Sequence, residues 1–152
     1  MKYLTIIMLF FVTLTSNAEP FKLEVKPNGN NNYVTYDPDN WTFIATEDDF
    51  NVYLAKGERA ISENGWIFIT GMTILNEPKK YDFMARPVTR IFSHGAIDCQ
   101  NKEIYLLGDI FTSYDYEVQF VQYHGMGSYI SNLNVEGTAR NEVWKAVCNK
   151  SI

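Results

Sequence analysis

The stretch from Val88 to Thr112, VTRIFSHGAIDCQNKEIYLLGDIFT, holds two runs rich in β-branched and aromatic residues around Gln100-Asn101. Such runs on either side of a short polar turn predict a β-hairpin. If Gln100-Asn101 is a two-residue turn, the facing pairs are Cys99 with Lys102, Ile97 with Ile104, Gly95 with Leu106, and Ile91 with Ile110. All but the lysine are apolar or small, so this register predicts one face packed on a core and carrying Cys99. The opposite face is mixed, and we expect it to be partly solvated or covered by a partner.

Further strands are predicted on both sides of this hairpin, because short β-rich runs alternate with turn residues from Trp41 onward. The runs are Trp41 to Thr46, Phe50 to Ala55, Trp66 to Leu75, Val88 to Cys99, Glu103 to Thr112, and Glu117 to Tyr123. Short connections between consecutive runs favour an antiparallel meander. The segment 66–69 is apolar on both faces, which predicts a central strand covered by a helix on one side and by loops or a second copy on the other.

One helix is predicted, at the end of the chain. Thr138 follows Gly137 as an N-cap, and Ala139, Val143, Ala146 and Val147 recur at helical spacing. Cys148 widens this apolar stripe, so we expect it to point toward the face that carries Cys99. The predicted fold class is α+β: a single twisted antiparallel sheet of about six strands, over residues 41–152, with a C-terminal helix packed on one face and tied by a disulfide.

The N-terminus has the pattern of a signal peptide over residues 1–18. Lys2 precedes an apolar run from Leu4 to Leu14, and Ser16-Asn17-Ala18 supplies small residues before the cleavage point. The alternative is a buried N-terminal strand or helix. Cleavage before Glu19 leaves 134 residues and removes Lys2, which changes the formal net charge from -5 to -6. Residues 19–40 are polar and predict a lead-in with at most one short strand.

If the protein is exported, its two cysteines are expected to be oxidised. Cys99 and Cys148 are the only cysteines, and such a pair in an exported protein usually forms a disulfide. A metal site needs more ligands than two cysteines and two distant histidines, and a redox pair is usually a C-x-x-C. We therefore expect a structural disulfide and an exported protein that is periplasmic, on the outer surface or secreted, with no transmembrane segment after cleavage.

Composition favours a single folded domain and argues against one class of partner. The chain has 152 residues, of which 46% are hydrophobic and 15% aromatic, enough for one domain with a core. A pI near 5.0 argues against a nucleic-acid partner, because binding to phosphates needs clustered positive charge.

Candidate catalytic and metal-binding residues are few. His94 and Asp98 lie about 13 Å apart on a strand, and the nearest acid to His94 is the diagonal neighbour Asp109. His124 opens a glycine-rich turn without a nucleophile elbow. The acids at 37, 39 and 47–49 lack the spacing of a calcium loop. We therefore predict no enzyme, no metal and no cofactor, with a small hydrolase using His94 or His124 as the alternative.

The segment from Glu77 to Arg90 stands out on an acidic chain. It carries Lys79, Lys80, Arg86 and Arg90 interleaved with Tyr81, Phe83 and Met84. One interpretation is a solvated loop whose aromatic residues fold back on the core. The other is a contact surface for an acidic or glycosylated protein partner, with Lys79, Lys80, Tyr81, Arg86 and Arg90 as the binding residues.

The order of these features resembles the surface-adhesin protein E family of Gram-negative bacteria. The shared features are Asn76-Glu77-Pro78-Lys79-Lys80-Tyr81 after a central apolar strand, Ile97-Asp98-Cys99 ending a long strand, an acidic-aromatic run at 109–116, and Val147-Cys148 in a final helix. The resemblance covers about two thirds of the chain, from Phe50 to Asn149. No lipoprotein cysteine is present, and Asp82-Phe83-Met84 separates the basic pair from Arg86, both departures from the family pattern.

This resemblance implies a six-stranded antiparallel sheet with a disulfide-tethered C-terminal helix. It also implies a non-enzymatic, surface-exposed or periplasmic protein that self-associates, so a homodimer is expected as well as a protein partner. The best-studied relative adheres to host extracellular-matrix proteins, with a basic stretch like Lys79-Lys80 in its binding region. The alternative is a periplasmic or envelope-associated structural module that binds another component of the cell envelope.

Overall fold

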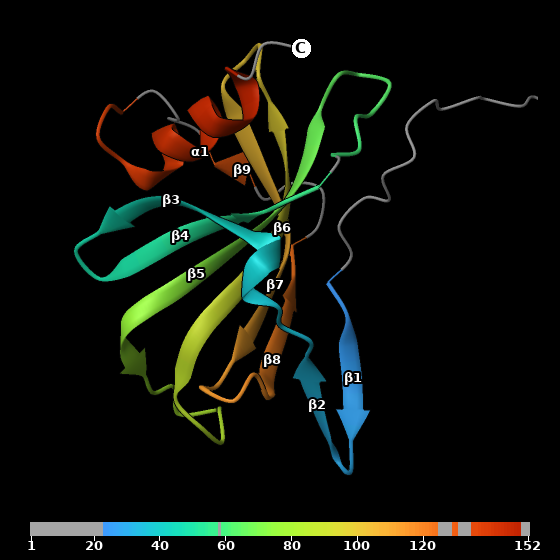
Figure 1. The fold of residues 1–152 in the computed structure, drawn as a ribbon, viewed down its shortest axis with the longest axis vertical. Helices are drawn as coiled ribbons and strands as arrows, with labels where there is room; N and C mark the ends of the chain where they lie inside the picture. The colour runs from blue at the N-terminus through green and yellow to red at the C-terminus, as the bar shows by residue number, and fades with distance from the viewer. Residues whose placement is uncertain (1–22, 58, 125–128, 131–134, 150–152) are drawn as a thin grey trace, which may run out of the picture.

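The computed structural model describes residues 23–57, 59–124, 129–130 and 135–149. Within these ranges, one antiparallel sheet runs in the order β3-β4-β5-β6-β7-β8, and β9 pairs with β7 beyond the end of β8 (Figure 1). The strands of this sheet are β3 (Trp41–Glu47), β4 (Phe50–Ala55), β5 (Ile67–Lys79), β6 (Val88–Asp98), β7 (Glu103–Thr112), β8 (Val118–Tyr123) and β9 (Tyr129–Ile130). The predicted antiparallel meander is therefore confirmed, with β9 as an addition that no sequence pattern indicated.

The predicted register of the central hairpin holds only near its turn. Ile97 pairs with Ile104 and Gly95 with Leu106, as expected. A bulge at Leu107 then shifts the ladder by one residue, so Ile91 pairs with Phe111 and not with Ile110. The prediction was wrong there because a bulge adds one residue to one strand only.

Helix α1 (Ala139–Cys148) packs on one face of the sheet, as predicted. The Thr138 hydroxyl caps it by accepting a hydrogen bond from the backbone N–H of Asn141. Its apolar stripe meets Leu54, Ile97 and Ile104 in a buried cluster. Cys148 is bonded to Cys99 with the two Cα atoms 5.6 Å apart, so the predicted disulfide is confirmed.

The N-terminal lead-in holds more structure than the one short strand predicted for it. Strands β1 (Val25–Asn28) and β2 (Asn31–Val34) form a hairpin, and the 3-10 turn η1 (Pro38–Asn40) leads into β3. Val34 is buried against Trp41, Met72 and Phe92 on the sheet face opposite to the helix. The face that was expected to be solvated or partner-covered is thus partly covered by the chain itself.

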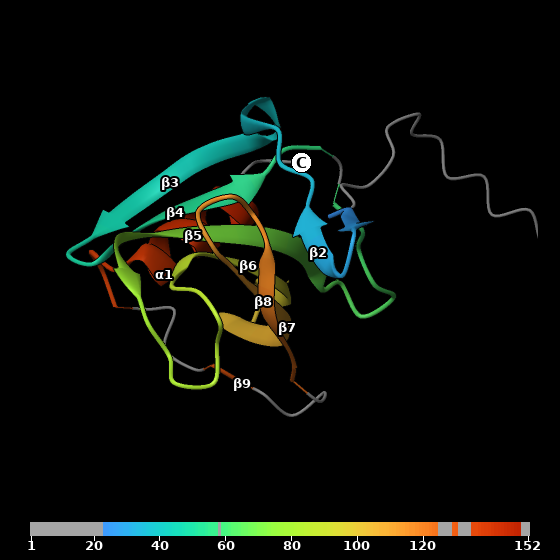
Figure 2. The same cartoon turned by 90° about the horizontal axis from the view of Figure 1, so that it is seen from below.

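The two coverings lie on opposite sides of a strongly twisted sheet. Figures 1 and 2 place α1 beside β3, β4 and β5, whereas the β1–β2 hairpin lies toward β8. No helix among the described residues is long and apolar enough to cross a membrane. The segment 80–87 and strand β8 lie at the end of the sheet away from α1, and this arrangement positions the candidate site.

Candidate contact surface

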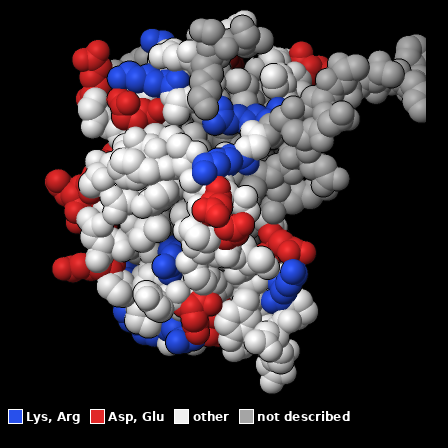
Figure 3. Space-filling model, in the orientation of Figure 1, with Lys and Arg blue, Asp and Glu red and all other residues white. Residues whose placement is uncertain are grey.

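The structure spreads the five predicted binding residues over two strands and their connection. Lys79 ends β5, Arg90 lies in β6, and Lys80, Tyr81 and Arg86 belong to the connecting segment 80–87. The predicted loop is therefore shorter than the basic-aromatic stretch, because β5 continues through Lys79. Each cation has a different environment. Figure 3 shows the basic side chains of the protein scattered over the drawn face of the molecule and not gathered in one patch.

Lys80 is engaged by its own loop. Its ammonium donates hydrogen bonds to the carbonyl oxygens of Met84, at 2.6 Å, and Ala85, at 2.9 Å. The Met84 side chain is buried, only 4% exposed, so these bonds close the loop over an apolar anchor. Lys80 therefore stabilises the loop conformation while it remains exposed.

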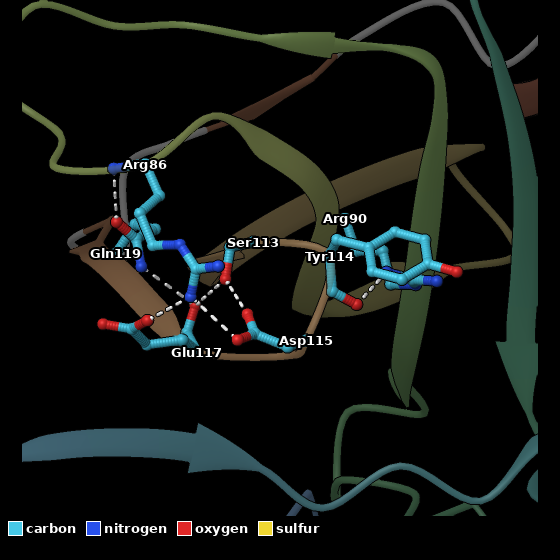
Figure 4. A network of polar contacts seen from close by, with 7 residues as sticks. All are labelled: Arg86, Arg90, Ser113, Tyr114, Asp115, Glu117 and Gln119. Atoms are coloured by element: carbon cyan, nitrogen blue, oxygen red, sulfur yellow. Dashed lines mark hydrogen bonds and ion pairs between the residues drawn. The ribbon is translucent and has the colours of Figure 1, made fainter.

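Arg86 is held in an acidic network, drawn in Figure 4. Its guanidinium Nη1 lies 2.7 Å from Glu117 and 2.8 Å from Asp115, and its backbone N–H donates to the Gln119 side chain at 2.9 Å. These bonds, first from Glu117 and then from Asp115, raise the pKa of Arg86. The Ser113 hydroxyl and Arg86 together lower the pKa of Asp115. The network ties the loop to the start of β8.

Arg90 is stacked on tyrosine rings. Its guanidinium carbon lies 4.4 Å from the ring centroid of Tyr116 and 5.5 Å from that of Tyr114. Nη1 of Arg90 donates a hydrogen bond to the Tyr114 carbonyl at 3.0 Å, as Figure 4 shows. Tyr116 stacks in turn on Tyr36, with centroids 4.7 Å apart. Burial raises the pKa of both tyrosines, against the opposing effect of the Arg90 charge. Arg90 thus joins β6 to the N-terminal hairpin region.

Lys79 is exposed, as are Lys80 and Arg86, and its ammonium lies 6.0 Å from the ring centroid of Tyr81. Three of the four basic residues are therefore engaged within the protein. Lys80 binds carbonyls, Arg86 binds carboxylates and Arg90 stacks on rings, while Lys80 and Arg86 also remain exposed.

The aromatic residues of the same region form a connected group, which we call the aromatic surface: Tyr81, Phe83, Phe111 and Phe120. Phe83 contacts both Tyr81 and Phe120, at centroid distances of 5.9 and 5.4 Å, and Phe111 lies 6.4 Å from Tyr81 and 6.0 Å from Phe120. Phe83 is 68% exposed and Phe120 39% exposed. Large exposed rings that contact one another are typical of the centre of a protein–protein interface.

Strand β8 continues this surface, and the sequence reasoning gave it no role. Its residues are VQFVQY, without a charged side chain, and the four from Phe120 to Tyr123 are all exposed. Edge strands are usually protected by charges or proline. The absence of charged residues and proline from VQFVQY can be read from the sequence and indicates an edge strand that is open to pairing.

The histidines have partners other than the one predicted. Asp109 lies 2.6 Å from Nε2 of His124, and not beside His94, because the bulge at Leu107 displaces it from the expected diagonal. Nδ1 of His94 lies 3.2 Å from the Thr70 hydroxyl.

Two of the acidic residues that were considered as calcium ligands have structural roles. Glu47 accepts a hydrogen bond from the backbone N–H of Ala139, and Asp37 accepts one from Asp39 at the start of η1. No group of three or more histidine, cysteine, aspartate or glutamate side chains is arranged to hold a metal ion in the described part of the chain.

Comparison of the chain with models of known protein families, with curated proteins and with solved structures gave no match.

Proposed function

We propose that this chain is an exported, non-enzymatic binding protein of the adhesin E type, which adheres to host extracellular-matrix proteins through the aromatic surface. The sequence resemblance supplies the class of protein and the class of partner. The Cys99–Cys148 disulfide is compatible with export. The observation that carries the choice of surface is the contact between Phe83 and Phe120, two exposed rings from different elements.

The surface differs from the one expected from the sequence in its chemistry. Rim charges mainly alter association rate and salt dependence, whereas buried aromatic side chains supply most of the binding free energy. Because Lys80, Arg86 and Arg90 already bind groups within the protein, we expect the aromatic rings to supply most of the binding free energy. Binding should therefore depend only weakly on salt, with Lys79 contributing a small part.

The test is surface plasmon resonance with the exported mature chain immobilised and purified fibrillar collagen or a reconstituted basement-membrane preparation as the probe. Phe83→Ser combined with Phe120→Ser should weaken binding at least tenfold. The matched control is Phe43→Ser. Phe43 is an exposed ring, at 54%, that lies on the edge strand β3 and contacts Tyr53 on the neighbouring strand β4, away from the aromatic surface. The control should bind within twofold of the parent.

Two results would sink the proposal. One is equal binding by the double variant and the control, which removes the aromatic surface from the interface. The other is no binding to either matrix preparation together with capture of an envelope component, which moves the partner to the cell envelope. The export step has its own test: mass spectrometry of the exported pool should find Glu19 at the N-terminus, and an intact Met1 would contradict signal cleavage.

A further inference from the structure

Strand β8 has an open edge over most of its length in the part of the chain that the structure describes. On one side β8 pairs with β7 from Gly108 to Thr112. On the other side, β2 approaches only at the start, where Tyr33 bridges Glu117 and the Val34 N–H donates to the Tyr116 carbonyl. Figures 1 and 2 show β2 beside β8 at this end. From Gln119 to Tyr123 no described strand continues the sheet.

The hydrogen-bonding phase of the open edge follows from one bond. The His124 N–H donates to the Leu107 carbonyl at 3.1 Å, so the backbone of His124 faces β7. Backbone groups of alternate residues in an antiparallel strand point to opposite sides. Those of Val121 and Tyr123 therefore point away from β7, with the spacing that another polypeptide strand requires.

Large apolar side chains lie next to this edge on both faces of the sheet, with Gln119 and Gln122 between them. Phe120 belongs to the aromatic surface, on the same face as Phe111, with which it pairs. On the other face is a hollow of about 370 Å³. Val121, Tyr123, Leu23, Phe92 and Ile110 form its apolar lining, and polar side chains that include His94 and Asp109 complete it. An added strand alternates its side chains between the two faces, so each face offers an apolar seat.

The chemistry of the edge selects the kind of ligand. Only a polypeptide backbone presents donors and acceptors in register with Val121 and Tyr123, and VQFVQY repels neither sign of charge. The β1–β2 hairpin already bonds to the same edge at Tyr116 and Glu117, so a strand placed beyond it extends an existing pairing.

We propose that β8 binds an extended segment of a partner protein as an added β-strand, with apolar side chains of that segment seated on Phe120 on one face and in the hollow beside Tyr123 on the other. This inference rests on the proposed binding function and specifies its mode. Main-chain hydrogen bonds give such a complex its affinity, and the alternating pockets give it specificity.

The experiment is a selection of ten-residue peptides from a random phage-displayed library on the mature chain, followed by affinity measurements on the enriched peptides. Enriched sequences should carry apolar residues at neighbouring positions, one for each face of the sheet. Val121→Pro should weaken their binding at least tenfold, because proline removes an outward N–H and is tolerated where that group faces away from the sheet. The matched control is Val121→Ala, which keeps the N–H and should lose no more than threefold.

A second measurement does not depend on folding of the proline variant. Peptide N-methylated at alternate residues keeps its side chains but cannot pair along one edge, and in one of the two methylation phases it should lose binding to the unmodified protein. Amide exchange at Val121 and Tyr123 should also slow when the unmethylated peptide is added.

Each contrary outcome has a distinct meaning. Failure to enrich any peptide, or peptides indifferent to both Val121→Pro and N-methylation, overturns strand addition; the proposed function still stands if the Phe83 and Phe120 variants lose matrix binding. A dimer in sedimentation analysis that Val121→Pro dissociates assigns the edge to a second copy and also overturns this proposal. If the Phe83 and Phe120 variants and the Val121→Pro variant all bind the matrix preparations as the parent does, the proposed function itself is wrong.

Discussion

The carboxylate of Glu47 and the backbone N–H of Ala139 are joined by a hydrogen bond of 2.7 Å, although 92 residues separate them in the sequence. Glu47 ends β3, and Ala139 is the first residue of α1. The first N–H groups of a helix have no partner within the helix, and the helix dipole favours a negative charge there. The edge of the sheet therefore supplies one of the caps of the helix that covers it.

Glu47→Gln should lower the free energy of unfolding by about 1 kcal/mol, because the charge at the helix N-terminus is lost while the amide oxygen still accepts. Glu47→Ala should cost more, because it also leaves a half-buried N–H unpaired. Urea unfolding measures both. Asp49→Asn, an exposed acid in the same turn, is the control and should stay within about 0.5 kcal/mol of the parent.

The disulfide should contribute about 4 kcal/mol in the chain-entropy description of a cross-link spanning 49 residues. The double variant Cys99→Ser, Cys148→Ser should lose this amount relative to the oxidised parent. Adding reductant to the parent should lower its unfolding midpoint to that of the variant. A midpoint in the oxidised parent that equals the reduced one would remove the structural role of the bond.

Substitution by alanine should destabilise the protein at Gly95 and have almost no effect on stability at Gly71. A Cβ on Gly95 would lie 2.7 Å from the Tyr105 carbonyl oxygen, because the bulge at Leu107 brings this backbone close, whereas a Cβ on Gly71 would meet nothing nearer than 3.7 Å. Gly95→Ala should cost about 1 to 3 kcal/mol, as in overpacked cores. Gly71→Ala should leave the unfolding midpoint nearly unchanged, and equal losses would contradict the close approach.

Asp98 should make stability depend on acid pH. Burial would raise the pKa of this carboxyl, but hydrogen bonds from Asn101 and from the Gln100 N–H outweigh burial and lower it. Because the folded pKa lies below the unfolded value of about 3.9, the contribution is present above that pH and is lost as pH falls further. Asp98→Asn should flatten the loss of stability between about pH 5 and pH 2, which chemical unfolding at several pH values measures. Asp82→Asn, an exposed acid, should leave the profile as in the parent.

The two adjacent lysines should differ in their effect on the loop. Lys80→Met removes the bonds to the Met84 and Ala85 carbonyls and should speed amide exchange over residues 81–86. Lys79→Met should leave this exchange unchanged, because Lys79 is exposed and its ammonium lies 6.0 Å from the Tyr81 ring centroid. Mass-spectrometric exchange measures both variants, and equal exchange in the two would place the loop's closure elsewhere.

Sequence reasoning reached the strands, the helix and the cross-link because each depends on local patterns. The Thr138 cap, the helical stripe and the hairpin near Ile97 and Ile104 are examples. It missed the β1–β2 hairpin, although Asn28-Gly29 is a turn signal and Gly29 has φ +64°. All four residues of β1 are exposed, so no apolar alternation marked the strand.

The candidate site was predicted only in composition. The rings and cations between Lys79 and Arg90 were identified, but their environments depend on residues far along the chain. Arg86 meets Glu117, 31 residues later, and Arg90 meets Tyr36 only through Tyr116. A sequence pattern reports which charges are present, whereas tertiary contacts decide which of them a partner meets.

The covalent link between β6 and the end of α1 also determines how the domain bears mechanical load. Tension applied before β1 and after α1 passes from Cys99 through the sulfur atoms to Cys148, bypassing β7, β8, β9 and the helix. About 170 Å of extensible chain is thereby withheld from stretching. The N-terminal hairpin and strands β3 to β6 carry the force. The open edge of β8, with Phe120 beside it, lies inside the closed ring, so a partner bound there stays on a part of the chain that tension between the ends does not draw out.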